Sequence, residues 1–159
     1  MIMAEAQGDD GIFVYMGGDQ EVPDGVRRAR IHKSVKIVHA RAFQNRRRLI
    51  SVEFHDGVEI IETEAFHFCT SLRGPIKLLG AKIIKERAFE YTKLTDVEFG
   101  DKLETIEAGA FGRCIKLKKI KMPYHRTGCI RWLFTARNSR SSWGGPPNCC
   151  LITYGELEK

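Results

Sequence analysis

One dipeptide, Ala-Phe, recurs along the 159-residue chain at spacings of 23, 23 and 22 residues, as Ala42-Phe43, Ala65-Phe66, Ala88-Phe89 and Ala110-Phe111. Further apolar residues recur in the same phase, in three ladders: Leu49, Leu72, Leu94 and Leu117; Val38, Ile61, Ile84 and Ile106; and Val35, Val58, Ala81 and Leu103. A fixed period of this length is typical of solenoids, in which each unit is one turn of a coil. Each ladder therefore predicts one column of stacked, buried side chains.

The repeating unit has two halves with different periodicities. In Leu49-x-x-Val52-x-Phe54 the last two apolar residues lie two apart, which is the period of a strand. Around Ala65-Phe66 a small residue precedes a large one, and Cys69 follows at the third position after Phe66, which suits a tight helical turn that buries the ring. We therefore predict an α/β repeat solenoid of short parallel strands joined by short helical turns.

These residues resemble the BspA-type leucine-rich repeats, whose motif is L-x-x-I-x-L-P followed by V-x-x-I-x-x-x-A-F-x-x-C. Residues 117–123 read L-K-K-I-K-M-P and match its strand half, whereas residues 61–69 read I-E-T-E-A-F-H-F-C and match its turn half. The resemblance covers roughly residues 22–123 and implies a curved, right-handed β-α superhelix with an interaction role. Because the motif contains no catalytic residue, none can be transferred. The cysteine position departs from the motif at Arg46 and Thr92.

The strand half at residues 72–78 contains one residue more than the others before its apolar pair. Counting from the ladder places Pro75 at a position that should face inward. Proline has no amide hydrogen to donate to a β ladder. We therefore predict a bulge or a local shift of register in this strand.

The ladders divide the chain into three segments. Residues 12–123 are predicted to form the solenoid, with an N-terminal cap and about four repeats of 22–23 residues. Residues 1–11 have no apolar period and are expected to be a disordered arm. Residues 124–159 are rich in Gly, Pro, Ser and Arg, which favours loop or disorder. Alternatively, this tail folds back as a cap through Trp132, Leu133, Phe134 and Trp143, or it is the product of a misread gene end.

The sequence shows neither a secretory signal nor a membrane-spanning segment. The start of the chain has neither the basic residues nor the apolar stretch of a secretory signal. No window approaches the ~18 consecutive apolar residues of a membrane span. The five cysteines are an odd number, and we interpret them as reduced thiols. We therefore expect an intracellular, cytoplasmic location, an expectation that a targeting segment upstream of Met1 would change.

Candidate chemical groups were weighed against structural roles. Cys69 and Cys114 occupy the same slot two units apart, and a small buried side chain is favoured there over redox or metal chemistry. The tail contains the one group that resembles a zinc site in composition, but adjacent cysteines make a poor half-site, so incidental thiols are favoured for His125, Cys129, Cys149 and Cys150. No Gly-rich phosphate loop is present. We predict no catalytic, cofactor-binding or metal-binding residue, and a protein that is not an enzyme.

Function is therefore expected to depend on a surface. Alternate strand residues should face outward from a sheet on the concave side. The predicted rows are Arg28, Ser51, Gly74, Asp96 and Lys119; and Arg30, Glu53, Lys77, Glu98 and Lys121, with the place of Lys77 dependent on the insertion. His32 and His55 extend a third row.

The charge pattern of these rows separates two classes of partner. A duplex or a membrane requires one sign of charge, whereas rows of mixed sign suit a protein. We predict that a protein of unknown identity binds the concave face through Arg28, Arg30, Ser51, Glu53, Asp96, Glu98, Lys119 and Lys121. The alternative is a polyanion such as nucleic acid, bound through the basic clusters at 27–48 and 116–121 of this chain of net charge +6. The sequence pattern does not indicate an oligomeric state.

Overall fold

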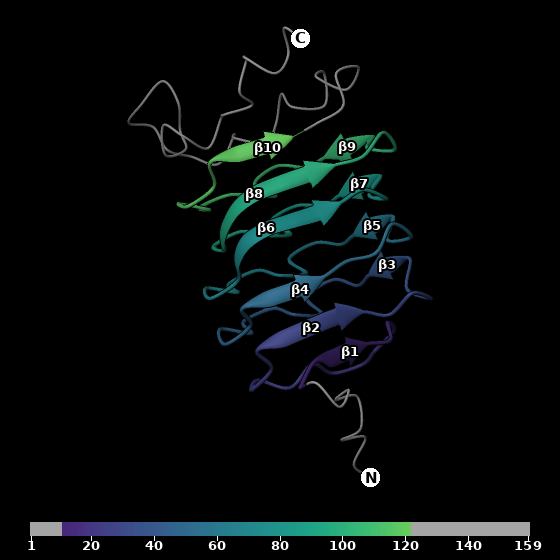
Figure 1. The fold of residues 1–159 in the computed structure, drawn as a ribbon, viewed down its shortest axis with the longest axis vertical. Coiled ribbons are helices and arrows are strands. Elements are labelled where there is room, and N and C mark those ends of the chain that lie inside the picture. The colour runs from purple at the N-terminus through teal and green to yellow at the C-terminus, as the bar shows by residue number, and fades with distance from the viewer. Residues whose placement is uncertain (1–10, 122–159) are drawn as a thin grey trace, which may run out of the picture.

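The computed structural model describes residues 11–121, and residues 1–10 and 122–159 lie outside the described part. Within it, parallel strands form two stacks that run along one axis (Figure 1). The long-strand side comprises β1 (Phe13–Tyr15), β2 (Arg28–Ile31), β4 (Ser51–Glu53), β6 (Arg73–Leu78), β8 (Lys93–Phe99) and β10 (Lys119–Lys121). The short-strand side comprises β3 (Ile37–Val38), β5 (Ile60–Ile61), β7 (Ile83–Ile84) and β9 (Thr105–Ile106).

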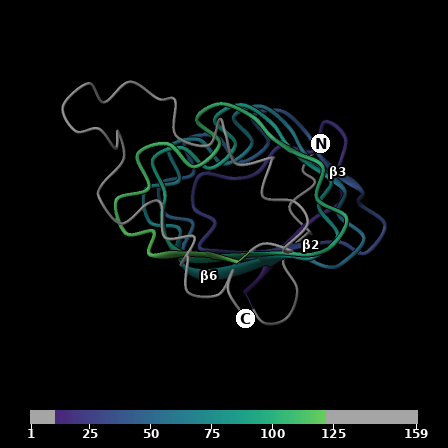
Figure 2. The same cartoon turned by 90° about the horizontal axis from the view of Figure 1, so that it is seen from above.

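Viewed along the axis, successive turns superimpose around a shared interior, with the long strands on one flat side (Figure 2). The hydrogen-bonded orders are β1-β2-β4, β10-β8-β6 and β3-β5-β7-β9. Residues one repeat apart pair directly: Ala29 lies opposite Val52, and Ile61 lies between Val38 and Ile84. The predicted repeat solenoid is therefore confirmed, and each ladder is a column perpendicular to the strands.

The column of phenylalanine rings is the centre of the core. Phe43, Phe66, Phe89 and Phe111 are at most 1% exposed. Their ring centroids are 4.8, 5.0 and 5.3 Å apart in succession, with interplanar angles of 13°, 2° and 4°. Tyr15 continues the column at the N-terminal end, tilted by 59° against Phe43 at 5.2 Å. The Ala-Phe repeat is thus one continuous aromatic stack, closed at this end by β1.

The expected helical turns are not found in residues 11–121, and the segments around each Ala-Phe pair are hydrogen-bonded turns. Their amides bond to the next turn of the solenoid instead of within one helix: Phe66 N donates to Ala88 O at 2.7 Å. Each segment also contains residues with positive φ, such as Glu64 at 57° and Phe68 at 58°. A helix cannot propagate through left-handed residues spaced this closely. The helical component of the predicted α/β class is therefore not seen in the described residues.

The predicted irregularity near Pro75 is confirmed, but its details differ from the expectation. The register between β6 and β8 shifts between Gly74 and Pro75, so that Pro75 pairs with Asp96. Pro75 is exposed, whereas Ile76 is buried opposite Val97. The prediction that Pro75 faces inward is therefore wrong, because the shift moves the proline outward, where its lack of an amide hydrogen is tolerated.

Candidate protein-binding face

The eight residues predicted to bind a protein all lie on β2, β4, β8 and β10. The register pairs Arg28 with Ser51, Arg30 with Glu53, Asp96 with Lys119, and Glu98 with Lys121. Lys77 joins the second row opposite Glu98, and Pro75 replaces Gly74 in the first row because of the register shift. We call these ten residues the strand face: Arg28, Arg30, Ser51, Glu53, Pro75, Lys77, Asp96, Glu98, Lys119 and Lys121.

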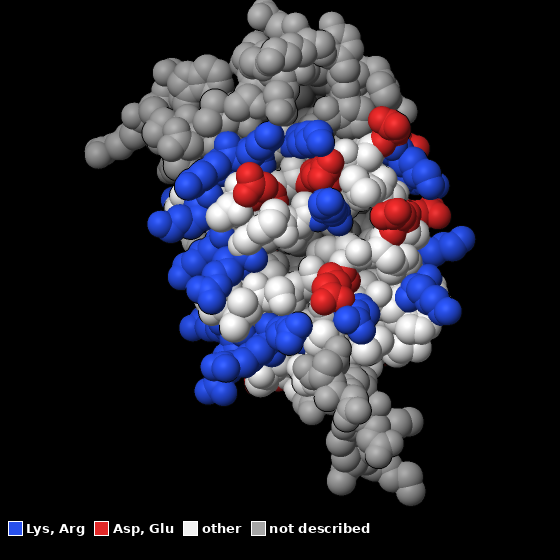
Figure 3. Space-filling view, viewed as in Figure 1, with Lys and Arg blue, Asp and Glu red and all other residues white. Residues whose placement is uncertain are grey.

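Charges of opposite sign alternate along the second row of the strand face. Arg30 Nε lies 2.6 Å from Glu53 Oε2, and Lys121 Nζ lies 3.0 Å from Glu98 Oε1. The hydrogen bond from Lys121 lowers the pKa of Glu98, and the charges of Lys121, Lys77 and Lys119 act in the same direction against a smaller desolvation effect. The row therefore presents fixed charges of both signs, which Figure 3 shows intermingled over the strands.

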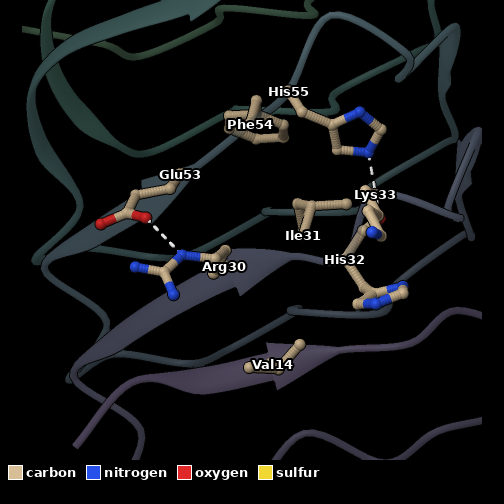
Figure 4. Close-up of a pocket in the computed structure, with 8 residues that line it drawn as sticks. All are labelled: Val14, Arg30, Ile31, His32, Lys33, Glu53, Phe54 and His55. Carbon is tan, nitrogen blue, oxygen red and sulfur yellow. Dashed lines mark hydrogen bonds and ion pairs between the residues drawn. The ribbon is translucent and has the colours of Figure 1, made fainter. Parts of the chain in front are cut away.

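A hollow of about 440 Å³ opens beside the Arg30–Glu53 pair, at the ends of β1, β2 and β4 (Figure 4). Its apolar walls are Val14, Ile31 and Phe54, and its other lining residues are Arg30, Glu53, His32, Lys33 and His55. Phe54 is itself fixed by edge-on contact with the Phe66 ring at 5.6 Å. The hollow thus combines an apolar wall with a charged rim. Sequence reasoning placed His32 and His55 in one row but did not predict the hollow.

His55 is held rigidly at the rim of this hollow. Its Nε2 lies 3.0 Å from His32 O and 3.1 Å from Val35 O, so it must carry a proton that it donates. Its Nδ1 accepts a hydrogen bond from Gly57 N at 3.0 Å. These bonds to the surrounding backbone fix the orientation of the ring at the rim of the hollow.

A second set of alternating charges covers the turns beyond the short-strand side. Glu64 Oε2 lies 2.9 Å from Arg41 Nε, and Glu64 Oε1 lies 3.8 Å from Arg87 Nη1. The Glu64 side chain is only 14% exposed, against 51% for Glu53 on the strand face. These ion pairs join three successive turns. We therefore assign them to holding the turns in register.

This arrangement predicts acid sensitivity. The hydrogen bond from Arg41 lowers the pKa of Glu64, outweighing desolvation. A carboxyl whose pKa is lower in the folded state adds stability above its unfolded pKa of about 4.3, and this stability is lost as the pH falls through the folded value. We expect Glu64→Gln to lower the free energy of unfolding at pH 7 and the difference from the unmodified chain to shrink toward pH 3. Urea titrations at several pH values measure this difference.

The control for this prediction is Glu21→Gln, because Glu21 is exposed and makes no ion pair within residues 11–121. It should leave the pH dependence of unfolding unchanged. A constant difference between Glu64→Gln and the unmodified chain from pH 7 to pH 3 would show that the carboxylate charge contributes nothing to stability.

The cysteines in the described residues have structural surroundings. Cys69 Sγ donates to Phe43 O at 3.0 Å, and Cys114 Sγ donates to Phe89 O at 3.1 Å. Both side chains are fully buried. Burial raises the pKa of Cys69 to about 12. A thiol with so high a pKa has almost no nucleophilic thiolate at neutral pH.

Residues 11–121 contain no group of three His, Cys, Asp or Glu side chains that could hold a metal ion. They also contain no helix long and apolar enough to cross a membrane. The tail group of His125, Cys129, Cys149 and Cys150 lies outside the described residues.

The comparisons with known proteins agree with this architecture. Residues 82–142 match the family described as BspA type leucine rich repeat region (6 copies). A leucine-rich repeat protein from Bacteroides ovatus ATCC 8483, with a crystal structure at 1.19 Å resolution, is similar with a TM-score of 0.56 and 24% sequence identity. The similarity covers 64% of this chain but only 27% of that one, and it concerns the fold alone. No curated protein matches the chain.

Proposed function

We propose that this chain, which carries a BspA-type leucine-rich repeat region, is a non-catalytic interaction module that binds a protein through its strand face. The observation that carries the proposal is the hollow beside the Arg30–Glu53 pair. Protein interfaces concentrate binding energy where an apolar or aromatic side chain fills a pocket surrounded by polar groups. Val14, Ile31 and Phe54 supply such a pocket, and the charged rows supply the surrounding groups.

The charge pattern of the strand face supports a protein partner over a uniform polymer. From Arg30 to Lys121 the row reads positive, negative, positive, negative, positive, through Glu53, Lys77 and Glu98. A partner with one sign of charge would meet repulsion at every second turn. A protein with a complementary pattern meets none, and the pattern also fixes its register along the solenoid.

The proposal can be tested without breaking the ion pairs, because the acidic and the basic residue of each pair can exchange places. Arg30→Glu with Glu53→Arg, and Glu98→Lys with Lys121→Glu, keep both pairs and the net charge while inverting the pattern. We expect a partner captured from cell extract with the unmodified full chain to bind this fourfold variant at least about tenfold more weakly, because each pairing across the interface becomes a repulsion. Isothermal titration with the purified partner measures the change.

The matched control exchanges the charges of another ion pair, through Glu59→Lys with Lys82→Glu. In this pair Lys82 Nζ lies 2.7 Å from Glu59 Oε2, and neither residue belongs to the strand face. It too preserves the net charge, and it should bind the partner normally. Circular dichroism verifies that both variants are folded. Unchanged affinity in the fourfold variant would remove the strand face from consideration.

A further inference from the structure

A row of cations lies along the edge at which the chain enters the long strands. We call it the basic ridge, and it consists of Arg27, Arg48, Arg73, Lys93, Lys116 and Lys118. All six side chains are exposed. Figure 3 shows Lys and Arg side chains along the margin where these strands begin, and this column is distinct from the mixed charges over the strands themselves.

The solenoid assembles this ridge from residues far apart in the sequence. Arg73 and Lys93 are direct partners in the β6–β8 pairing. Arg27 O accepts hydrogen bonds from the Ile50 and Ser51 amides, so Arg48 lies two residues before the position opposite Arg27 in the next turn. Lys118 N donates to Thr95 O at 2.8 Å. Each of five successive turns thus contributes a cation. At about 4.8 Å per turn, the ridge extends roughly 20 Å along the axis.

Among the described residues, the ridge differs from the other charged rows because its cations make no ion pair. Within residues 11–121, none of its six side chains lies within ion-pair distance of a carboxylate, in contrast to the paired cations Arg30, Arg41 and Lys82. The connecting segments that carry it in the second to fifth turns contain no Asp or Glu: 45–50, 68–73, 91–95 and 113–118. Cations in a row of this length repel one another, and this repulsion destabilises the folded chain. A bound polyanion neutralises the cations and removes the repulsion.

We propose that the basic ridge binds a single strand of nucleic acid through its phosphates, as a function separate from protein binding on the strand face. The mixed charge that disfavours nucleic acid on the strand face does not apply here, because every turn of the ridge is positive. A linear polymer with a negative charge on every residue matches this row, whereas the side chains of a typical protein do not.

An aromatic surface beside the ridge favours a single strand over a duplex. Tyr91, two residues before Lys93, is 37% exposed and stacks on Phe68 with ring centroids 4.5 Å apart. Both residues have positive φ, 60° for Tyr91 and 58° for Phe68, a conformation that bulky residues rarely adopt. Single-strand binding sites combine cations along the backbone with aromatic side chains beside the bases. In a duplex the bases are paired and stacked on one another.

The test is fluorescence anisotropy of the full chain with a labelled oligothymidylate of about 20 nucleotides, between about 50 and 200 mM salt. If all six cations contact phosphates, a plot of the logarithm of the binding constant against the logarithm of the salt concentration should have a slope of about −4. The ridge variant combines Arg48→Gln, Arg73→Gln and Lys93→Gln. It should bind at least about tenfold more weakly at low salt, and its slope should be shallower by about 2.

The matched control combines Lys36→Gln, Arg87→Gln and Lys102→Gln, three exposed cations away from both the ridge and the hollow. Both triple variants lower the formal net charge of +6 by three, so any difference between them reports position and not total charge. Equal weakening in the two variants would overturn the proposal, and so would no binding at about 50 mM salt. If poly-glutamate bound as tightly as the oligonucleotide, the ligand of the ridge would be an acidic protein, which contradicts the proposal. If a duplex bound more tightly than the single strand, the ligand would be double-stranded nucleic acid, which also contradicts it. None of these outcomes affects the strand-face exchange experiment.

Discussion

Phe66→Ala is expected to lower the free energy of unfolding by about 3–5 kcal/mol, the range for removing a large aromatic side chain from a core. The ring is fully buried and stacks between Phe43 and Phe89 at 4.8 and 5.0 Å. Neighbouring turns cannot collapse into the cavity, because the backbone bonds between turns fix their spacing. Denaturant titration followed by circular dichroism measures the change. A loss of this size is a large part of the total stability of a typical domain.

The control is Tyr91→Ala, which removes a ring from the same side of the solenoid but from its surface. Tyr91 is 37% exposed, and its ring stacks on Phe68 at 4.5 Å and makes a tilted contact with His67 at 6.1 Å. We expect a loss of about 1 kcal/mol, the typical value of one aromatic pair. If both substitutions had equal effects, the aromatic column would not be the main source of stability.

Gly80→Ala should have the second largest effect, a loss of about 2–3 kcal/mol or more. A Cβ atom on Gly80 would overlap the Asp56 carbonyl oxygen and lie 2.6 Å from the Asp56 carbonyl carbon. These are backbone atoms of the preceding turn, so the clash cannot be relieved by a rotamer change and requires the two turns to separate. Thermal and denaturant unfolding measure the loss.

Gly25→Ala is the matched control, because an added Cβ there meets no atom within 4 Å and the residue has no positive φ. It should be neutral or stabilise by up to about 1 kcal/mol, through the lower entropy of the unfolded chain. If Gly80→Ala behaved like Gly25→Ala, the close approach of the two turns would not exist in solution.

The core was predictable from the sequence because burial and period coincide at every turn. The positions of Phe43, Phe66, Phe89 and Phe111 follow from spacing alone, and so does the pairing of Arg30 with Glu53. The form of the turns was not predictable in this way. A small residue, a large residue and a Cys suit both a helical turn and a left-handed one, and the choice between them depends on hydrogen bonds to the next turn.

The surface features required three-dimensional information to different degrees. The hollow depends on how β1, β2 and β4 end beside one another, which no single repeat encodes. The basic ridge includes Arg73 and Lys93, which are isolated cations in the sequence and become neighbours only through the shifted register of β6 and β8. The sequence clusters at 27–48 and 116–121 were therefore recognisable, but the row that joins them was not.

The hydrogen-bonded thiol of Cys69 gives the solenoid a built-in reporter of its own opening. Because the folded thiol is shielded and its pKa is about 12, an alkylating reagent can modify it only in molecules whose second turn has separated from the first. The rate of Cys69 alkylation, followed peptide by peptide with mass spectrometry, therefore measures how often this region opens without any added label. The same measurement at Cys114 reports on the fourth turn, so the two rates compare the local stability of the second and fourth turns of the array.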